Sequence, residues 1–184
     1  MAVAIAMVSL AGCDKIKDAT SIDIEANNVK FDFSAVVEEA AEAQANAAAV
    51  MRRTAVINTF SETRTVDISE LSSAELEEYA NKITNVTASS PVIEVTMSPA
   101  GAYAVENLTF TAEGVANSLV VPAYTIGGEF TPPANVNTYM AAFIMKLLTA
   151  KTVEVTISGM TDAPKGTTVT ISYGSDLVLK ASLL

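Results

Sequence analysis

Cys13 is the only cysteine in this 184-residue sequence, and the sequence contains no histidine. Serine and cysteine hydrolases need an imidazole base that titrates near neutral pH, and zinc is held mainly by histidine and cysteine. A single cysteine also precludes an internal disulfide. The sequence has neither a glycine-rich dinucleotide loop nor a phosphate-binding loop. We therefore expect no catalytic triad, no metal site and no cofactor.

Carboxylates are the remaining groups suited to acid–base chemistry, because glycoside hydrolysis needs only two of them at a defined separation. The candidates are Glu94, Glu106, Glu113, Glu129 and Glu154. Glu94 and Glu154 alternate with apolar neighbours, which favours solvent-facing strand positions. Asp162 and Asp176 lie in expected loops, where calcium binding is an alternative to turn formation. The sequence favours a protein that is not an enzyme, with a carboxylate-based glycosidase as the weaker alternative.

The first thirteen residues have the form of a secretory signal, an apolar run that ends in small residues. Leu10-Ala11-Gly12-Cys13 resembles the lipobox of bacterial lipoproteins. That resemblance implies cleavage between Gly12 and Cys13, diacylglycerol on the Cys13 thiol, and an acyl chain such as palmitate on the new terminus. Two or more chains are needed for stable anchoring.

Other interpretations of this segment are a buried strand or an ordinary cleaved signal peptide. A membrane-spanning helix needs about 20 apolar residues, so the run is too short for one. No Lys or Arg precedes the run, which leaves open whether Met1 is the true start. Asp14 follows the cysteine directly, and this sorting cue fits either inner-membrane retention or export to the cell surface.

The charge of the chain restricts its partners. It has 21 acidic and 11 basic residues, and a formal net charge of −10. Nucleic-acid binding requires a basic surface, whereas the only adjacent basic pair here is Arg52-Arg53. We expect no nucleic-acid partner, and membrane association through covalent lipid rather than through charge.

After residue 20 the apolar residues recur with a period of two, as in half-buried strands. Residues 22–24 and 31–33 begin this pattern. Turn-forming residues at 61–62, 89–91, 113–114 and 174–176 divide the rest into short strands. The strands are expected at residues 54–59, 63–68, 83–88, 92–97, 105–111, 118–122, 152–158, 167–173 and 177–183. About nine short strands with turns every eight to twelve residues predict an antiparallel sandwich.

Three segments favour helices. Residues 73–81 begin with the capping-box pair Ser72 and Glu75. Asn137 can cap a helix over residues 138–149. Residues 38–51 have the propensity of a helix, while the alternation of alanine with polar residues fits a strand; we expect the helix.

The helix at 138–149 has a broad apolar face, and its possible ligand contacts are Met140, Phe143, Ile144 and Leu147. Packing against a sheet is the simpler interpretation. A lid over an apolar cavity is the alternative, and it would make the protein a carrier of a small apolar ligand or lipid.

We therefore predict a mainly β fold, an antiparallel β-sandwich in the immunoglobulin-like style with two or three short helices. The expected organisation is a signal peptide at 1–12, a lipidated cysteine and tether at 13–20, and one domain at 21–184. Strand spacing and lipobox together resemble the small all-β envelope lipoproteins of the Bacteroidota. We expect a lipid-anchored binding or interaction module with an envelope protein or glycan as partner. The outer membrane is favoured, with its periplasmic or surface side open.

Overall fold

The computed structural model describes residues 21–40, 58–71, 79–127 and 131–182. These residues are mainly β, with two antiparallel sheets and one α-helix, α3 (Val136–Ala150). The 3-10 helices η2 (Ile68–Leu71) and η3 (Ala80–Lys82) are short. The strands are β1 (Ser21–Val36), β2 (Glu38–Glu39), β3 (Asn58–Asp67), β4 (Ile83–Ser98), β5 (Ala104–Ala112), β6 (Leu119–Thr125), β7 (Thr152–Thr161) and β8 (Thr168–Ser182). No helix in the described ranges is long and apolar enough to cross a membrane.

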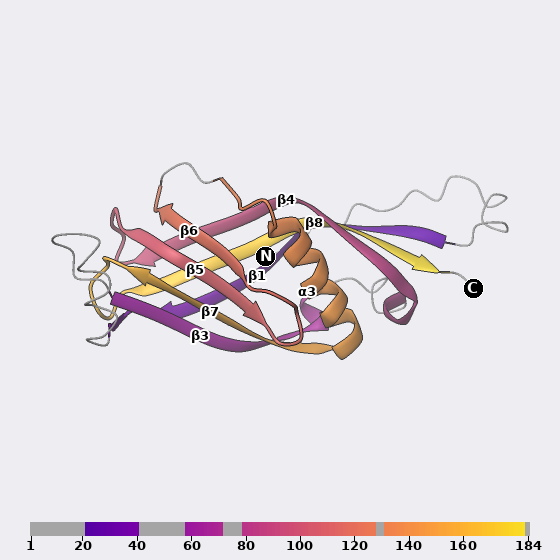
Figure 1. Cartoon of the computed structure of the whole chain (residues 1–184), viewed down its shortest axis with the longest axis horizontal. Coiled ribbons are helices and arrows are strands. Elements are labelled where there is room, and N and C mark those ends of the chain that lie inside the picture. Colours follow the sequence, from indigo (N-terminus) through magenta and orange to yellow (C-terminus); the bar gives the residue numbers. More distant parts are fainter. Residues whose placement is uncertain (1–20, 41–57, 72–78, 128–130, 183–184) are drawn as a thin grey trace.

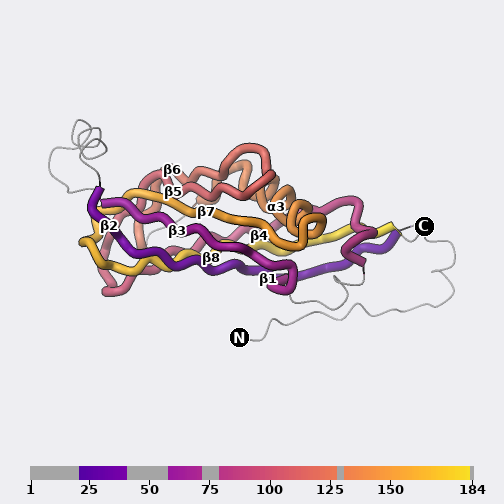
Figure 2. Tube along the Cα trace, turned by 90° about the horizontal axis from the view of Figure 1, so that it is seen from below, coloured from indigo at the N-terminus to yellow at the C-terminus, as the bar shows by residue number. Residues whose placement is uncertain are grey.

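The two sheets form two layers (Figures 1 and 2). One sheet has the strand order β1-β8-β4, and the other has the order β2-β3-β7-β5-β6. The chain passes between them at Val37, because Val36 pairs with Thr168 in β8 whereas Glu38 pairs with Thr59 in β3. Val37 is itself buried. The chain therefore closes one side of the core at this crossing.

The core lies between the layers and follows the predicted alternation. In β1, Phe31 and Phe33 are buried while Lys30 and Asp32 are exposed. The ring of Phe33 meets that of Phe110 in β5 edge-on, with the ring centroids 6.3 Å apart. Each fully buried side chain of this size contributes about 1.5–3 kcal/mol through the apolar surface removed from water. Contacts of this kind hold the two sheets together.

Three strands are longer than the sequence predicts, so three predicted turns are wrong. Residues 61–62 lie inside β3, residues 89–91 inside β4, and residues 174–176 inside β8. The turn at 113–114 is confirmed. The described residues consequently form fewer and longer strands than the nine short ones expected.

The turn-forming residues of β1 and β4 are used in bulges that lie at one level of the three-stranded sheet. From Ala26 to Val29, β1 advances by three residues, whereas the paired segment of β8, from Leu177 to Ser175, advances by two. Between Ser89 and Val92, β4 does the same against the same part of β8. An extra residue bends a strand and increases its twist. In both strands the extra residue changes which side chains face the core, from even-numbered residues before the bulge to odd-numbered residues after it. Apolar side chains therefore face the core on both sides of the bulge.

Beyond these bulges the three-stranded sheet continues as an arm, formed by residues 21–26, 83–89 and 177–182. Ser21 pairs with Ser182 at its tip. Figure 1 shows the arm extending past the five-stranded sheet on the side of the C-terminus. The helix α3 packs against β4, β7, β8 and η3. Its Phe143 meets Phe31 of β1 edge-on, with centroids 5.2 Å apart, so α3 fills the core where the second sheet ends.

The helix predicted at 138–149 is confirmed, but it begins earlier, at Val136. Asn137 therefore lies inside α3, and its predicted role as the cap is wrong. The helix ends at Ala150, and the next residue, Lys151, has a φ of 69° and donates its backbone N–H to the Leu147 carbonyl at 2.9 Å. This left-handed ending satisfies a carbonyl of the last turn.

The other two predicted helices fall mostly outside the described residues. A helix beginning at Glu38 is wrong, because Glu38 and Glu39 form β2; residues 41–51 lie outside the described ranges. Residues 73–78 of the predicted helix at 73–81 are also outside them, as is its predicted cap, Ser72. The end of that prediction corresponds to η3, a 3-10 helix.

Candidate functional site

A hollow of about 390 Å³ opens on the outer face of the five-stranded sheet, at the end opposite the arm. Its polar lining comes from four strands. The lining residues are Glu38, Thr59, Phe60, Ser61, Asn107, Ser158, Gly159 and Met160. Because β1 runs for 16 residues from the arm tip toward Glu38, the hollow and the tip are about 50 Å apart at about 3.3 Å per residue.

The hollow centres on Gly159, which pairs with Phe60 of β3. A Cβ on Gly159 would lie 2.5 Å from Cζ of Phe60, so the phenyl ring fills the space that a side chain would need. On the other side, β5 carries Asn107 and Leu108 opposite Gly159 alone, and Asn107 has a φ of 51°. The Phe60 ring and the missing side chain of Gly159 are on the inner face, so Gly159 lines the hollow with its backbone, beside the bulge of β5. Bulges commonly re-aim side chains beside binding sites.

Hydroxyl groups continue from the hollow across the sheet in two rungs, which we call the hydroxyl rungs. A rung is a set of residues paired side by side on neighbouring strands. The hydroxyl rungs are Ser61, Ser158 and Thr109, then Thr63, Thr156 and Thr111. The Oγ1 atoms of Thr63 and Thr156 are 2.8 Å apart and share a hydrogen bond. Ser61 and Thr109 already donate their hydroxyl hydrogens to the carbonyls of Ile157 and Asn107, so toward a ligand lying on the face these two groups act as acceptors.

The charges around the hollow are negative. Glu38 is exposed on the rung of Thr59 and Met160, Glu106 pairs with Met160, and Glu154 lies beyond the hydroxyl rungs. The lysines and arginines in the described ranges lie on other elements or, in the case of Arg64, on the inner side of β3. Of these, Lys165 is next to Gly166, which donates its N–H to the carbonyl of Val37 beside Glu38. The basic residues are Lys30 and Lys180 on the three-stranded sheet, Arg64 against Phe33, Lys82 in η3, Lys146 in α3, and Lys151 and Lys165 in connections.

The four apolar residues predicted as ligand contacts lie in the core. Met140, Ile144 and Leu147 have no exposed surface, and 3% of Phe143 is exposed. None of the four lines the hollow. They pack in the cluster formed by both sheets and α3. Cys13 and Gly12 lie outside the described residues.

The candidate carboxylates are spread over the surface. Glu94 is on the three-stranded sheet, Glu106 and Glu154 are on the other one, and Glu113 is in the β5–β6 turn; Glu129 lies outside the described residues. The described residues bring no three His, Cys, Asp or Glu side chains together as a metal site would.

Asp162 and Asp176 both bind backbone. An oxygen of Asp162 accepts the Ala104 N–H, and one of Asp176 accepts the Asn28 N–H, each at 2.8 Å. Each aspartate therefore fixes the backbone of a neighbouring strand. The bond from Asn28 stabilises the bulge of β1.

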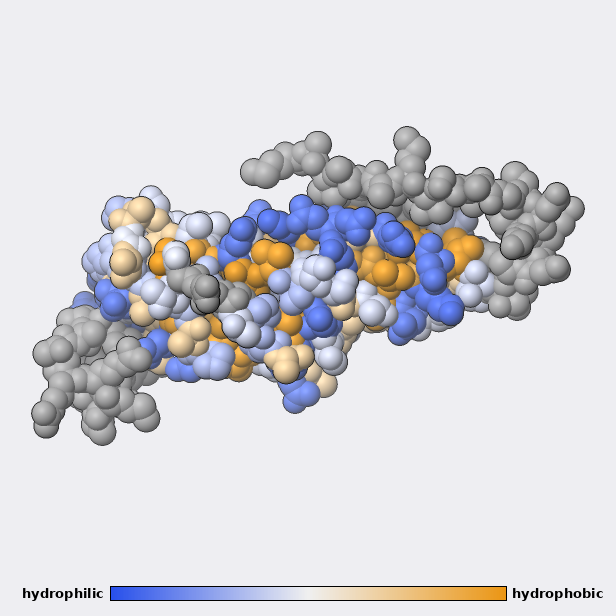
Figure 3. Space-filling view, turned by 90° about the horizontal axis from the view of Figure 1, so that it is seen from above, coloured by the Kyte–Doolittle hydropathy of each residue, from blue (hydrophilic) through white to orange (hydrophobic). Residues whose placement is uncertain are grey.

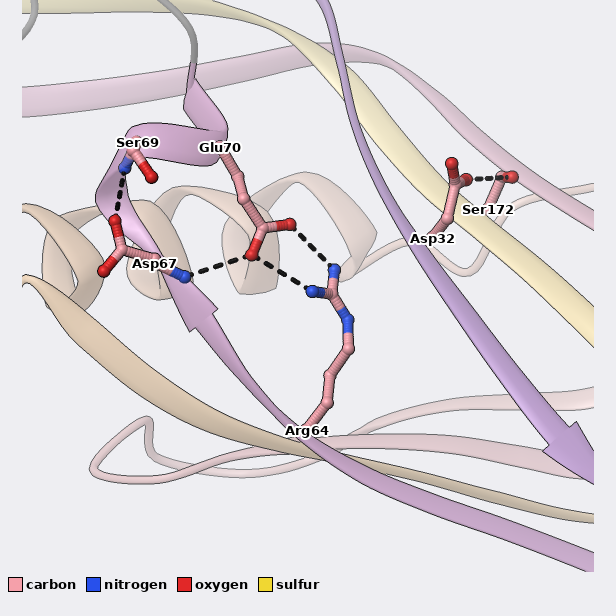
Figure 4. A network of polar contacts seen from close by, with 6 residues as sticks. All are labelled: Asp32, Arg64, Asp67, Ser69, Glu70 and Ser172. Atoms are coloured by element: carbon pink, nitrogen blue, oxygen red, sulfur yellow. Dashed lines mark hydrogen bonds and ion pairs between the residues drawn. The ribbon is translucent and has the colours of Figure 1, made fainter.

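A polar network that the sequence does not predict lies where β3 meets η2 (Figure 4). The guanidinium of Arg64 donates two hydrogen bonds to the Glu70 carboxylate, at 2.9 and 3.0 Å, and lies 4.7 Å from the ring centroid of Phe33. Hydrogen bonds from the side chain and backbone of Ser69 lower the pKa of Asp67. Through their contacts, Arg64 and Glu70 close the edge of the core between β1 and β3. Figure 4 also shows a separate hydrogen bond, in which Ser172 of β8 donates to Asp32 of β1.

Two buried tyrosines, Tyr139 in α3 and Tyr173 in β8, lie close together near the start of α3. Burial raises the pKa of Tyr139 to about 12, although the Ala112 backbone lowers it in part. Burial and then the neighbouring Tyr139 raise the pKa of Tyr173. The Tyr173 hydroxyl donates to the Val136 carbonyl at 3.1 Å. These phenols are structural groups of the core.

Hydrophobic side chains do not gather at the hollow. In the part of the chain that the structure describes, the exposed large hydrophobic side chains are Val36, Val120 and Val178, each on a different strand. Figure 3 shows hydrophobic residues interspersed with hydrophilic ones over the face seen from above. The hollow therefore differs from its surroundings in shape and acidity rather than in hydrophobicity. No known family, curated protein sequence or solved structure matches the chain.

Proposed function

We propose that the protein is a lipid-anchored component of a bacterial cell envelope whose β domain is a non-catalytic binding module. The observation that carries this proposal is Leu10-Ala11-Gly12-Cys13 at the end of an apolar run. Cleavage before Cys13 would leave 172 of the residues in this sequence (184 − 12), with the acyl chains attached to Cys13 as the new N-terminus. We propose the outer membrane as the site of anchoring.

The direction of β1 supports the use of the hollow as the binding site. Ser21, at the arm tip, follows Cys13 by only eight positions, and eight extended residues reach about 28 Å. An anchored chain would therefore hold the arm toward the membrane. The hollow, about 50 Å along β1, would face away from the lipid. A surface in that position is accessible to other envelope components.

We further propose that the two layers form a β-sandwich in the immunoglobulin-like style. The shared core and the edge-to-face contact of Phe33 with Phe110 support it. In aligned sandwiches the strand directions of the two sheets differ by about 30°. A crystal structure with that angle would support the proposal, whereas sheets crossing near 90° would contradict it.

Anchoring is tested by producing the full chain in a Gram-negative host fed with an alkyne analogue of palmitate. We expect label on the membrane-bound chain, and mass spectrometry should find the diacylated terminus at Cys13. Cys13→Ser should abolish both, while the matched variant Ser9→Ala should keep them. A wild-type chain that is unlabelled and released from membranes would overturn the anchoring proposal.

The binding role is tested with a photo-crosslinking amino acid at Ser61, in the hollow, and at Thr96, on the outer face of the three-stranded sheet. We expect discrete crosslinked products in intact cells from position 61 and none from position 96. Equal products from both positions, or none from position 61, would contradict a binding role for the hollow.

A further inference from the structure

We infer that the hollow binds a basic peptide segment, with a lysine side chain at Glu38 and the peptide backbone along the hydroxyl rungs. This inference rests on the proposed function, since it names the chemistry of the partner. Among the described residues, the lining contains a carboxylate, hydroxyl groups, a carboxamide and a thioether, and no basic group. Such a lining can accept hydrogen bonds from an ammonium group and give it a counter-ion.

Charge complementarity selects the partner. The charged side chains that the described residues place on this outer face are Glu38, Glu106, Glu154 and, at the far end of β3, Asp67. The seven lysines and arginines of the described ranges lie off it, and the whole chain carries −10. A phosphate, an acidic glycan or a second copy of this face would be repelled, whereas a cationic segment would be attracted.

The form of the face selects an extended chain over a compact ligand. The hollow is open to solvent, and the hydroxyl rungs lie beside it and cross β3, β7 and β5, with one hydroxyl group from each strand in each rung. Because the hydroxyl hydrogens of Ser61 and Thr109 are donated to the protein's own carbonyls, these two oxygens are left to accept from peptide N–H groups. Sugar binding ordinarily uses an exposed aromatic ring, and the one ring in the lining, Phe60, is 2% exposed beneath Gly159. These features favour peptide over glycan.

The test uses the full chain, extracted in detergent, and three probes: hexalysine, hexaglutamate and maltohexaose. Calorimetry at about 0.15 M salt gives the affinity, and amide chemical shifts locate the site. We expect hexalysine alone to bind, with shifts at Thr59, Ser61, Ser158 and Met160. Glu38→Gln should weaken it about five- to tenfold, because a charge-assisted hydrogen bond is lost. The matched control Glu25→Gln, an exposed carboxylate on the arm, should change the affinity less than twofold.

Four outcomes would overturn the inference. Equal weakening by Glu38→Gln and Glu25→Gln would mean attraction to the net charge alone. Binding of maltohexaose or hexaglutamate at the hollow would mean a different ligand class. Absence of hexalysine binding would remove the site. A tenfold gain on replacing Arg52 and Arg53 by Gln would mean that the chain's own basic pair is the occupant. Acyl labelling and membrane attachment would be unaffected, so a failure here is distinct from a failure of the anchor.

Discussion

The Lys30 side chain of β1 crosses the central strand β8 to reach Glu94 of β4, with 3.5 Å between Nζ and Oε2. It passes over Gly174, which pairs with both Lys30 and Val92. A Cβ on Gly174 would lie 2.7 Å from Cγ of Lys30 and 2.5 Å from the Val29 carbonyl oxygen. The backbone contact cannot be relieved by a side-chain rotation.

Gly174→Ala should therefore destabilise the protein by about 2 kcal/mol or more, since the strands must separate to admit the methyl group. Lys30→Met, which removes only an exposed ion pair, should cost less than about 1 kcal/mol. Urea unfolding followed by circular dichroism measures both. Equal losses for the two variants would show that the ion pair, and not the close approach of the strands, matters here.

Gly159→Ala should also destabilise the fold, by about 1–3 kcal/mol, because its Cβ overlaps the Phe60 ring. Phe60→Leu alone leaves a cavity and should cost about 1–2 kcal/mol. The double variant should lose less than the sum of the two single losses, because the smaller side chain makes room. Additive losses in this cycle would contradict the packing of Phe60 under Gly159.

The Arg64–Glu70 pair should contribute about 1–2 kcal/mol, since two charge-assisted hydrogen bonds form with the side chains only 26% and 32% exposed. Glu70→Gln should lose most of this. Arg64→Lys should not restore the wild-type value, because an ammonium group lacks the fork that binds both oxygens. Full stability in Arg64→Lys would mean that charge alone is sufficient.

Asp67 should make stability depend on pH in the acid range. Hydrogen bonds from Ser69 lower its pKa below the ordinary value of 3.8. A lowered pKa in the folded state gives stability that is present above the unfolded-state pKa and lost as pH falls through the folded-state pKa. Below about pH 4, the free energy of unfolding should therefore fall more in the wild type than in Asp67→Asn. Parallel curves for the two proteins in urea titrations from pH 5 to pH 2 would rule this out.

Tyr139 should have the opposite effect in alkali. Its pKa of about 12 exceeds the ordinary value of 10.0, so its contribution is present below pH 10 and lost as pH rises through 12. Thermal unfolding between pH 9 and pH 12 should show a steeper decline for the wild type than for Tyr139→Phe. Absorbance at 295 nm checks the cause, because the variant should lose amplitude near pH 12 only. A loss of amplitude near pH 10 would contradict burial of this hydroxyl.

The sequence predicts much of the local structure, because the alternation in β1 and the apolar face of α3 depend on residues near one another. It fails at residues 89–91 and 174–176, where Ser, Pro and Gly are typical of turns. Gly174 is required because a neighbouring backbone approaches it, and Ser90 is part of a bulge. Both depend on strand pairing, which local patterns do not encode.

The hollow could not be predicted for the same reason. Phe60, Asn107 and Gly159 are far apart in the sequence, and they become neighbours only when β3, β5 and β7 pair in register. None of these three residues belongs to a sequence motif for catalysis or metal binding. The predicted apolar contacts, in contrast, were identified by helical periodicity, which indicates a buried face as readily as a ligand site.

The bulges at one level of the three-stranded sheet affect how readily its edge strands could pair with those of a neighbouring molecule. Proteins tethered to a membrane are confined to two dimensions and meet one another often, so an uninterrupted free strand invites edge-to-edge aggregation. Both edges of this sheet are interrupted, by Asn28 in β1 and by Ser90 and Pro91 in β4, and Pro122 lies within the edge strand β6. Under the proposed anchoring, the free edges of this sheet would offer neighbouring molecules only short regular rows of backbone groups on either side of the bulges, the longest being residues 29–36 of β1 and 92–98 of β4.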